Sequence, residues 1–88
     1  MDADTANKAF LAFLARKASQ IGEPLAEVPH ASQRLSGGWA FYYQSKTFVE
    51  TGDAMTRLVG HGPVVIRDDG RIIEGGSSHH DPETLLLR

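Results

Sequence analysis

The sequence predicts an α+β fold in which an N-terminal helix packs on a small antiparallel sheet of three or four strands, with a short helix between the middle strands. Three patterns support this prediction: an apolar stripe of helical period before residue 22, an aromatic run of strand period after residue 38, and a hairpin signal around residue 69. At 88 residues the chain has room for one small core, so we expect a single domain over residues 1–88.

The first segment has the periodicity of an amphipathic helix. Its larger apolar side chains recur at helical spacing and therefore fall on one face. They are Phe10, Phe13, Leu14, Ala18 and Ile21. We expect Asp4 or Thr5 to cap the start of this helix and Gly22 to end it.

The strand signals begin at residue 25. Residues 25–28 alternate as a strand does, Pro29 ends that strand or confines it to a sheet edge, and residues 30–35 are expected to resume pairing after a bulge. Residues 39–45 form the strongest strand, with four aromatic side chains in seven residues. Alternation puts Trp39, Phe41 and Tyr43 on the core face and Tyr42 on the opposite face.

The second half of the chain contains a short helix and a hairpin. Residues 47–50 are expected to form a turn or a short 3₁₀ segment, and Asp53 to cap a helix of about two turns that ends at Gly60. Residues 63–67 and 71–74 are expected to pair around a tight turn that Gly70 permits. A last short helix is predicted after Asp81 and Pro82.

Composition excludes several classes of protein. Nine basic and eleven acidic residues give a net charge of −2, which lacks the basic footprint of a nucleic-acid-binding protein. There is no cysteine, so disulfides, thiolate metal sites and cysteine nucleophiles are absent. No apolar run approaches the roughly 18 residues that a membrane span needs, so no membrane association is expected.

The candidate chemical groups do not assemble into a reactive pattern. His79 and His80 are neighbours and point to opposite sides of an extended chain, where they serve as a solvated linker more readily than as metal ligands. Asp68 and Asp69 are typical of a hairpin turn that faces water. No serine has a histidine and a carboxylate in a triad pattern, and no glycine-rich phosphate loop occurs. The sequence therefore indicates neither an enzyme nor a metal or cofactor site.

Four short motifs follow one another in the middle of the chain: Gly38–Tyr43, Phe48–Asp53, Leu58–Pro63 and Val65–Gly70. In this order and at this spacing they resemble the immunity protein 35 family of small bacterial proteins, which includes YrhB-like members. The match covers about residues 37–75, which we take as the family-like core. From the resemblance we interpret a set of residues as fold-defining: Trp39, Phe41, Gly52, Asp53, Gly60, Pro63 and Gly70.

The resemblance implies a cytoplasmic bacterial protein of a polymorphic toxin system. Such an immunity protein, or antitoxin, binds a cognate toxin domain in a stoichiometric complex and needs no catalysis. The alternative is a small chaperone-like or stress-related interaction module without a dedicated toxin, which is the role attributed to YrhB-like members. Homodimerisation is compatible with both readings, because small sheets leave edges that can pair.

Expected exposure selects a set of candidate contact residues. They are Tyr42, Gln44, Arg57 and His61, with Asp68 and Asp69 as peripheral charges. Tyr42 either packs under a helix or stands exposed as a binding anchor. The segment Glu50–Asp53 either shapes the start of the short helix, with Gly52 in a conformation that other residues avoid, or meets the toxin.

Overall fold

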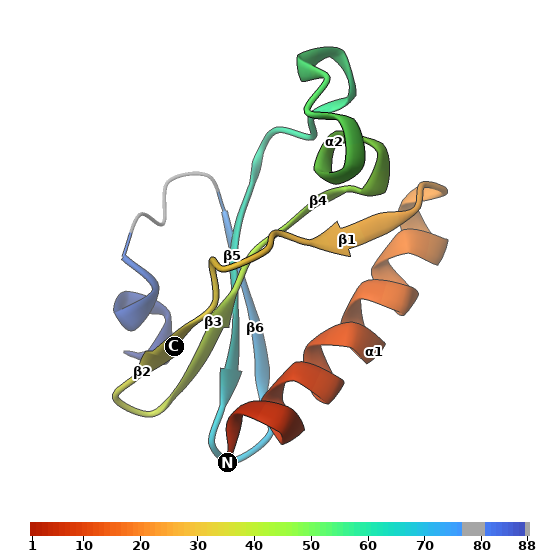
Figure 1. Ribbon diagram of the computed structural model, residues 1–88. Coiled ribbons are helices and arrows are strands. Elements are labelled where there is room, and N and C mark those ends of the chain that lie inside the picture. Colours follow the sequence, from red (N-terminus) through yellow and green to blue (C-terminus); the bar gives the residue numbers. More distant parts are fainter. Residues whose placement is uncertain (77–80, 88) are drawn as a thin grey trace.

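A nineteen-residue helix lies across two antiparallel sheets in the computed structural model of the protein, which describes residues 1–76 and 81–87 (Figure 1). One sheet has the strand order β1-β4 and the other β2-β3-β5-β6, so the predicted α+β class is confirmed. The elements in chain order are α1 (Ala3–Ile21), β1 (Leu25–Glu27), β2 (Gln33–Leu35), β3 (Gly38–Phe41), β4 (Tyr43–Ser45), α2 (Lys46–Thr51), the 3₁₀ segment η1 (Ala54–Thr56), β5 (His61–Arg67), β6 (Ile72–Gly76) and the 3₁₀ segment η2 (Pro82–Leu87).

Helix α1 begins earlier than the sequence pattern predicts. Asp2 caps it, because this residue is extended and its carboxylate accepts a hydrogen bond from the Thr5 backbone at 2.8 Å. Asp4 lies inside the first turn, so the prediction that Asp4 or Thr5 caps the helix is wrong. The predicted end is correct: Gly22 has φ 73° and its N–H donates to the Ala18 carbonyl at 2.9 Å.

The main core lies between α1 and the sheets. Phe10 is fully buried and its ring stacks on that of Phe41, with the ring centroids 4.7 Å apart. Phe41, Tyr43 and the partly buried Trp39 face this core from the aromatic run, as the alternation predicts. The buried members are Ala6, Phe10, Phe13, Leu14, Phe41, Tyr43, Val64 and Ile66.

Segment η2 covers the opposite face of the four-stranded sheet (Figure 1). Leu85 is fully buried against Leu35, Ala40 and Val65. The Glu83 carboxylate accepts hydrogen bonds from the backbone N–H and the hydroxyl of Ser36, which fastens η2 to the β2–β3 turn. The helix predicted after Asp81 is thus present as a 3₁₀ segment, whereas the His79–His80 pair lies outside the described residues.

The aromatic run forms two strands instead of the single strand predicted over residues 39–45. Strand β3 pairs with β2, and β4 pairs with β1. Glu27 faces Tyr43 while Gln33 faces Ala40, so six steps along one side match three along the other. The Val28 N–H still donates to the Tyr42 carbonyl at 2.9 Å, so residues 29–32 bulge out of the sheet. This bulge includes His30 at φ 61°, the only positive φ outside glycine among the described residues.

The connection between β4 and β5 also differs from the prediction. Residues 46–51 form the α-helix α2, whereas the helix expected from Asp53 to Gly60 is reduced to the three residues of η1. Tertiary hydrogen bonds take the groups that this helix would use: the Ser45 hydroxyl donates to the Thr56 carbonyl, and the Gln44 side chain pairs with both backbone groups of Leu58. The predicted helix from Asp53 to Gly60 is too short to compete with these tertiary hydrogen bonds, because helix nucleation is unfavourable.

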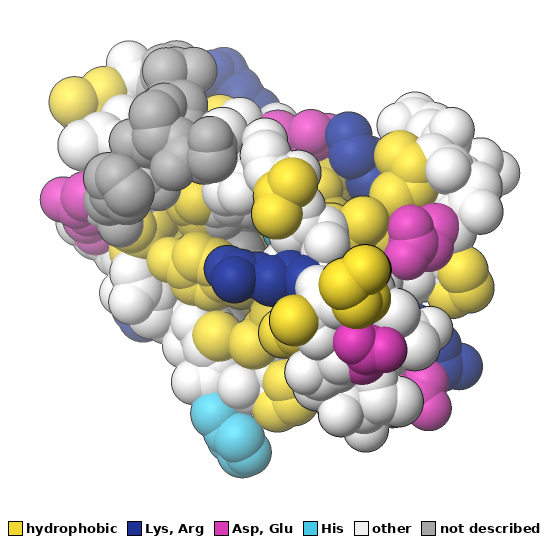
Figure 2. Space-filling view, turned by 90° about the horizontal axis from the view of Figure 1, so that it is seen from above, with side chains coloured by type: hydrophobic (Ala, Val, Ile, Leu, Met, Phe, Trp, Pro, Cys, Tyr) yellow, Lys and Arg dark blue, Asp and Glu magenta, His cyan; other side chains and the backbone are white. Residues whose placement is uncertain are grey.

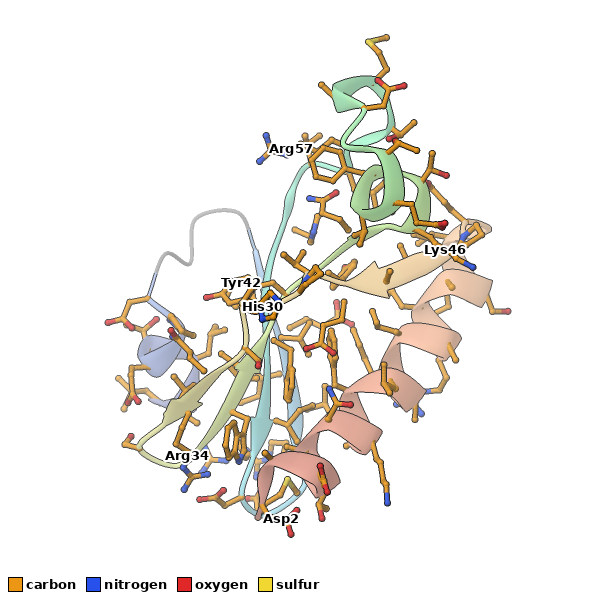
Figure 3. The ribbon with its side chains drawn as sticks, in the orientation of Figure 1. Asp2, His30, Arg34, Tyr42, Lys46 and Arg57 are labelled. Atoms are coloured by element: carbon orange, nitrogen blue, oxygen red, sulfur yellow. The ribbon has the colours of Figure 1, made fainter. Side chains whose placement is uncertain are left out.

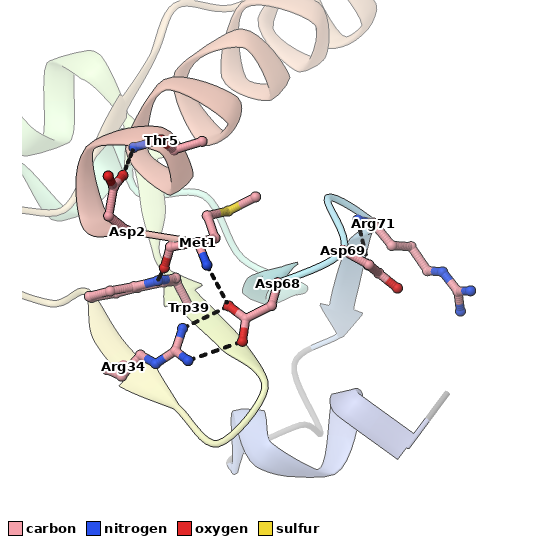
Figure 4. A network of polar contacts seen from close by, with 8 residues as sticks. All are labelled: Met1, Asp2, Thr5, Arg34, Trp39, Asp68, Asp69 and Arg71. Carbon is pink, nitrogen blue, oxygen red and sulfur yellow. Dashed lines mark hydrogen bonds and ion pairs between the residues drawn. The ribbon is translucent and has the colours of Figure 1, made fainter.

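A polar network ties the chain start to the β5–β6 turn (Figure 4). The Asp68 carboxylate accepts two hydrogen bonds from the Arg34 guanidinium, at 2.8 and 3.0 Å, and lies 3.6 Å from the Met1 amino group. The Trp39 indole N–H donates to the Met1 carbonyl at 3.1 Å. The Arg34 hydrogen bonds lower the pKa of Asp68 below its ordinary value of 3.8.

Acid unfolding tests this network. Because the pKa of Asp68 is lower in the folded state, its stabilisation is complete above about pH 5 and is lost as pH falls through the folded pKa, below 3.8. We expect Arg34→Gln to reduce the loss of stability between pH 5 and pH 2, measured by urea unfolding at each pH. Arg16→Gln, an exposed change on α1, is the control. Identical pH profiles for wild type and Arg34→Gln would contradict the coupling.

Truncation of the central ring tests the main core. We expect Phe10→Ala to lower the free energy of unfolding by about 3–5 kcal/mol, because it removes a fully buried ring and leaves a cavity. Leu11→Ala, at a neighbouring side chain that is 48% exposed, should cost less than about 1 kcal/mol. Urea unfolding of both variants measures the difference, and equal losses would place the core elsewhere.

Candidate protein-binding groove

A groove opens where β4 and β5 separate. Strands β3 and β5 pair from Gly38 opposite Arg67 to Phe41 opposite Val64, and beyond this point β4 pairs with β1 instead. The chain that leads into β5, residues 57–62, stays apart from β4 and leaves a hollow of about 750 Å³ between them. Val28 directly after β1, Ala31 of the bulge and Phe48 of α2 also line it.

Gln44 holds the far wall of the groove in place. Its side-chain amide donates to the Leu58 carbonyl at 3.1 Å and accepts from the Leu58 N–H at 2.9 Å. These are the two hydrogen bonds that a neighbouring strand would make with Leu58, so one side chain substitutes for a stretch of sheet. The sequence selected Gln44 as a contact residue, but its amide is already committed to the protein's own backbone.

His61 makes the second bridge across the groove. Its Nε2 lies 2.7 Å from the Tyr43 carbonyl, which can only accept, so this nitrogen carries the proton and donates. The imidazole also stacks on the Tyr43 ring, with centroids 4.5 Å apart. Burial raises the pKa of the Tyr43 hydroxyl, so this side chain stays neutral.

Tyr42 and Arg57 are the groove residues with unused polar groups. Tyr42 is half-buried in the wall, and no described hydrogen bond uses its hydroxyl. Arg57 is exposed, and within the described residues no carboxylate lies at ion-pair distance from its guanidinium. Both side chains extend to the same side of the molecule, away from Lys46 and α1 (Figure 3).

The rim of the groove exposes large apolar side chains. Val59, which lines the groove, is 85% exposed, and Met55, four residues earlier, is 91% exposed. Seen from the α2 end, this part of the surface has hydrophobic side chains gathered around a basic one (Figure 2). Met55 and Val59 lie between Gly52 and Gly60, in a segment too short to form a stable helix. This position was the available sequence signal that the two side chains are exposed.

The six predicted contact residues fall into two groups. Tyr42, Gln44, Arg57 and His61 all line the groove, although they are up to 19 positions apart in the sequence. Asp68 and Asp69 lie in the β5–β6 turn, in the network with Arg34 and with Arg67, whose Nε is 3.5 Å from Asp69. The structure therefore brings four of the candidates together in the groove. The two aspartates instead form ion pairs with arginines of the same protein.

The residues interpreted as fold-defining occupy constrained positions. Gly52, Gly60 and Gly70 have φ angles of 73°, 87° and 91°, and Asp53 caps η1 by accepting from the Met55 N–H at 3.0 Å. Pro63 is buried and lines the groove. The sequence reading missed Gly62, where an added Cβ would collide with the Gly76 carbonyl at a bulge between β5 and β6. Only glycine at position 62 allows this end of the groove to pack closely against the β6 backbone.

Residues 1–76 and 81–87 contain neither a cluster of metal-ligating side chains nor a candidate membrane-spanning helix. No three side chains of the metal-ligating types come together there as a cation site. No helix in the same part of the chain is both long and apolar enough to cross a lipid bilayer.

Comparison with known proteins identifies the family. The family described as Immunity protein 35 matches residues 3–83, and the chain belongs to this family. It is also similar to "Uncharacterized protein YrhB" of Escherichia coli (strain K12), with 41% identity over 46 residues. That match covers 51% of this chain and 49% of the relative, so it spans about half the length of each. No solved structure matches the chain.

Removal of the Gln44 amide tests the account of the groove wall. Gln44→Ala leaves the Leu58 N–H and carbonyl without partners, so we expect a loss of about 1–3 kcal/mol in unfolding free energy and faster hydrogen exchange at the Leu58 amide. Gln33→Ala, at an exposed side chain of β2, is the matched control. NMR hydrogen exchange measures both, and an unchanged rate at Leu58 in Gln44→Ala would refute the clamp.

Proposed function

We propose that this protein is an immunity protein that binds a cognate toxin domain through the groove and neutralises it in a stoichiometric complex. The observation that carries the proposal is the combination of family membership with a groove whose apolar rim, Met55 and Val59, stands in solvent. A monomer gains nothing from exposing such side chains, whereas an interface core needs them.

The residue types in the groove favour protein recognition. Tyr and Arg are enriched among residues that dominate binding energy, and Tyr42 and Arg57 have polar groups available. A standard interface covers about 800 Å² on each partner. This chain has 5270 Å² of accessible surface, so such an interface would take roughly one seventh of it.

The same geometry supports inhibition by binding over catalysis. The groove contains one imidazole, and its Nε2 is used in the hydrogen bond to Tyr43. The Gln44 amide is used by Leu58. No described carboxylate lines the groove as a partner for general acid–base chemistry. We therefore propose a non-enzymatic protein that acts in the cytoplasm of the toxin-producing cell, where an immunity protein meets its toxin.

Co-expression with a toxin tests the proposal directly. The probe is the toxin domain encoded beside this chain, as membership in an immunity family implies. We expect this protein to restore growth of cells that express the toxin domain and to form a complex of fixed stoichiometry, measured by size-exclusion chromatography with light scattering. Failure of both readouts, with weak binding to many unfolded clients, would instead support the chaperone-like alternative, and a homodimer alone would support neither.

Tyr42 provides the mutational test. We expect Tyr42→Ala to weaken toxin binding by about 2 kcal/mol, roughly 30-fold in Kd, because it removes an aromatic anchor from the groove wall. Calorimetric titration measures the affinity, and thermal unfolding checks that the variant is folded. Gln33→Ala, on the exposed side of β2, is the control for binding. A folded Tyr42→Ala protein with wild-type affinity would exclude the groove as the binding surface.

A further inference from the structure

We propose that the groove receives an extended segment of its protein partner in which a carboxylate side chain is flanked by apolar ones, and that Arg57 pairs with this carboxylate. The inference rests on the proposed function and specifies the chemistry of the partner at the same site. Its basis is the charge of the groove relative to the rest of the molecule.

The groove differs in sign from the chain that contains it. The protein as a whole has a net charge of −2, yet Arg57 is the one fully charged side chain among the described residues that line the groove. Three cations outside the groove form ion pairs within the protein: Arg34 with Asp68, Lys17 with Glu74 and Arg67 with Asp69. Asp53, four residues before Arg57, instead uses its carboxylate to accept from the Met55 N–H.

The backbone around Arg57 is held before any partner arrives. The Arg57 N–H donates to the Ala54 carbonyl at 3.3 Å, and the next residue, Leu58, is bonded on both sides by Gln44. Preorganisation of this kind lowers the entropy lost on binding. A guanidinium so placed can bind a carboxylate through two parallel hydrogen bonds, a geometry that lysine does not offer.

The surroundings of Arg57 specify an apolar environment for that carboxylate. Tyr43, Val59 and Pro63 line the groove, and Met55, two residues before Arg57, is exposed outside this lining. A volume of about 750 Å³ lies within the range of small-molecule sites, roughly 300–1,000 Å³. A small molecule inside the groove would leave Met55 uncovered, because Met55 does not line the groove, whereas a protein segment that continues past the groove can cover it.

The groove also has the form of an interrupted sheet. It lies between β4 and residues 57–62, at the end of the β3–β5 ladder, where the Gln44 and His61 side chains bridge the two sides. Because the β3–β5 ladder ends at Val64, an extended partner segment can continue the strand arrangement beside the first residues of β5. The neighbouring bulge separates β1 from β2, and its residue Ala31 lines the groove.

A peptide selection tests this inference without the toxin. Random nine-residue peptides displayed on phage are panned against the folded wild-type protein, and the selected peptides are synthesised and titrated by fluorescence anisotropy. We expect the selected sequences to contain one Asp or Glu flanked by apolar residues. We expect Arg57→Glu to weaken their binding at least tenfold, Arg57→Lys to have an intermediate effect, and Arg71→Glu, an exposed change in the β5–β6 turn, to stay within twofold of wild type.

Each outcome decides the inference. Arg57 is exposed, so its variants should fold, and thermal unfolding verifies this. Selection of apolar peptides without an acidic residue, selection of none, or equal binding by Arg57→Glu would overturn the inference. If the toxin binds wild type and Arg57→Glu equally, the proposed function stands and the assigned chemistry of the groove is wrong. If peptides behave as expected but the toxin does not bind, the groove chemistry stands and the proposed function fails.

Discussion

The pairing of one side-chain amide with one backbone residue sets the shape of the binding surface. Gln44 offers Leu58 the donor and the acceptor that a neighbouring strand would offer, at 3.1 and 2.9 Å. The Gln44 side chain thus provides hydrogen-bond partners for the Leu58 N–H and carbonyl. Residues 57–62 therefore do not need to pair with the β4 backbone, and the sheet stays open at this point. The groove, its apolar rim and the position of Arg57 all depend on the Gln44 side chain taking the place of a neighbouring strand.

The rest of the fold supplies a rigid frame for the opening. The buried rings of Phe10 and Phe41 fix α1 against the sheet, and Leu85 seals the opposite face. At the far end of the molecule, Arg34 and Asp68 hold the β5–β6 turn to β2. Since the described ion pairs lie outside the groove, it is left with a surface that is mainly apolar and carries one guanidinium.

Local patterns predicted the elements whose stability is local or periodic. The helical stripe located α1, the aromatic alternation located the core face, and the Asp68–Gly70 turn located the hairpin. Prediction failed where tertiary bonds override local preference. The strand around Tyr42 splits because its partner changes register at the bulge, and the helix after Asp53 stops because Ser45 and Gln44 claim its backbone groups. Four of the residues chosen for their expected exposure do line the groove. Only the structure shows that the polar groups of Gln44 and His61 already form hydrogen bonds within the protein.

Hydrogen exchange of the complex between this protein and its toxin domain, followed by mass spectrometry, tests the central claim most directly. If the toxin binds in the groove, we expect slower exchange in residues 42–44 and 55–63, which include both walls of the groove, and unchanged exchange in the β5–β6 turn and on the exposed face of α1. Slowed exchange confined to α1 or to the β2 edge, with residues 55–63 unaffected, would show that the toxin binds another surface and would contradict the account.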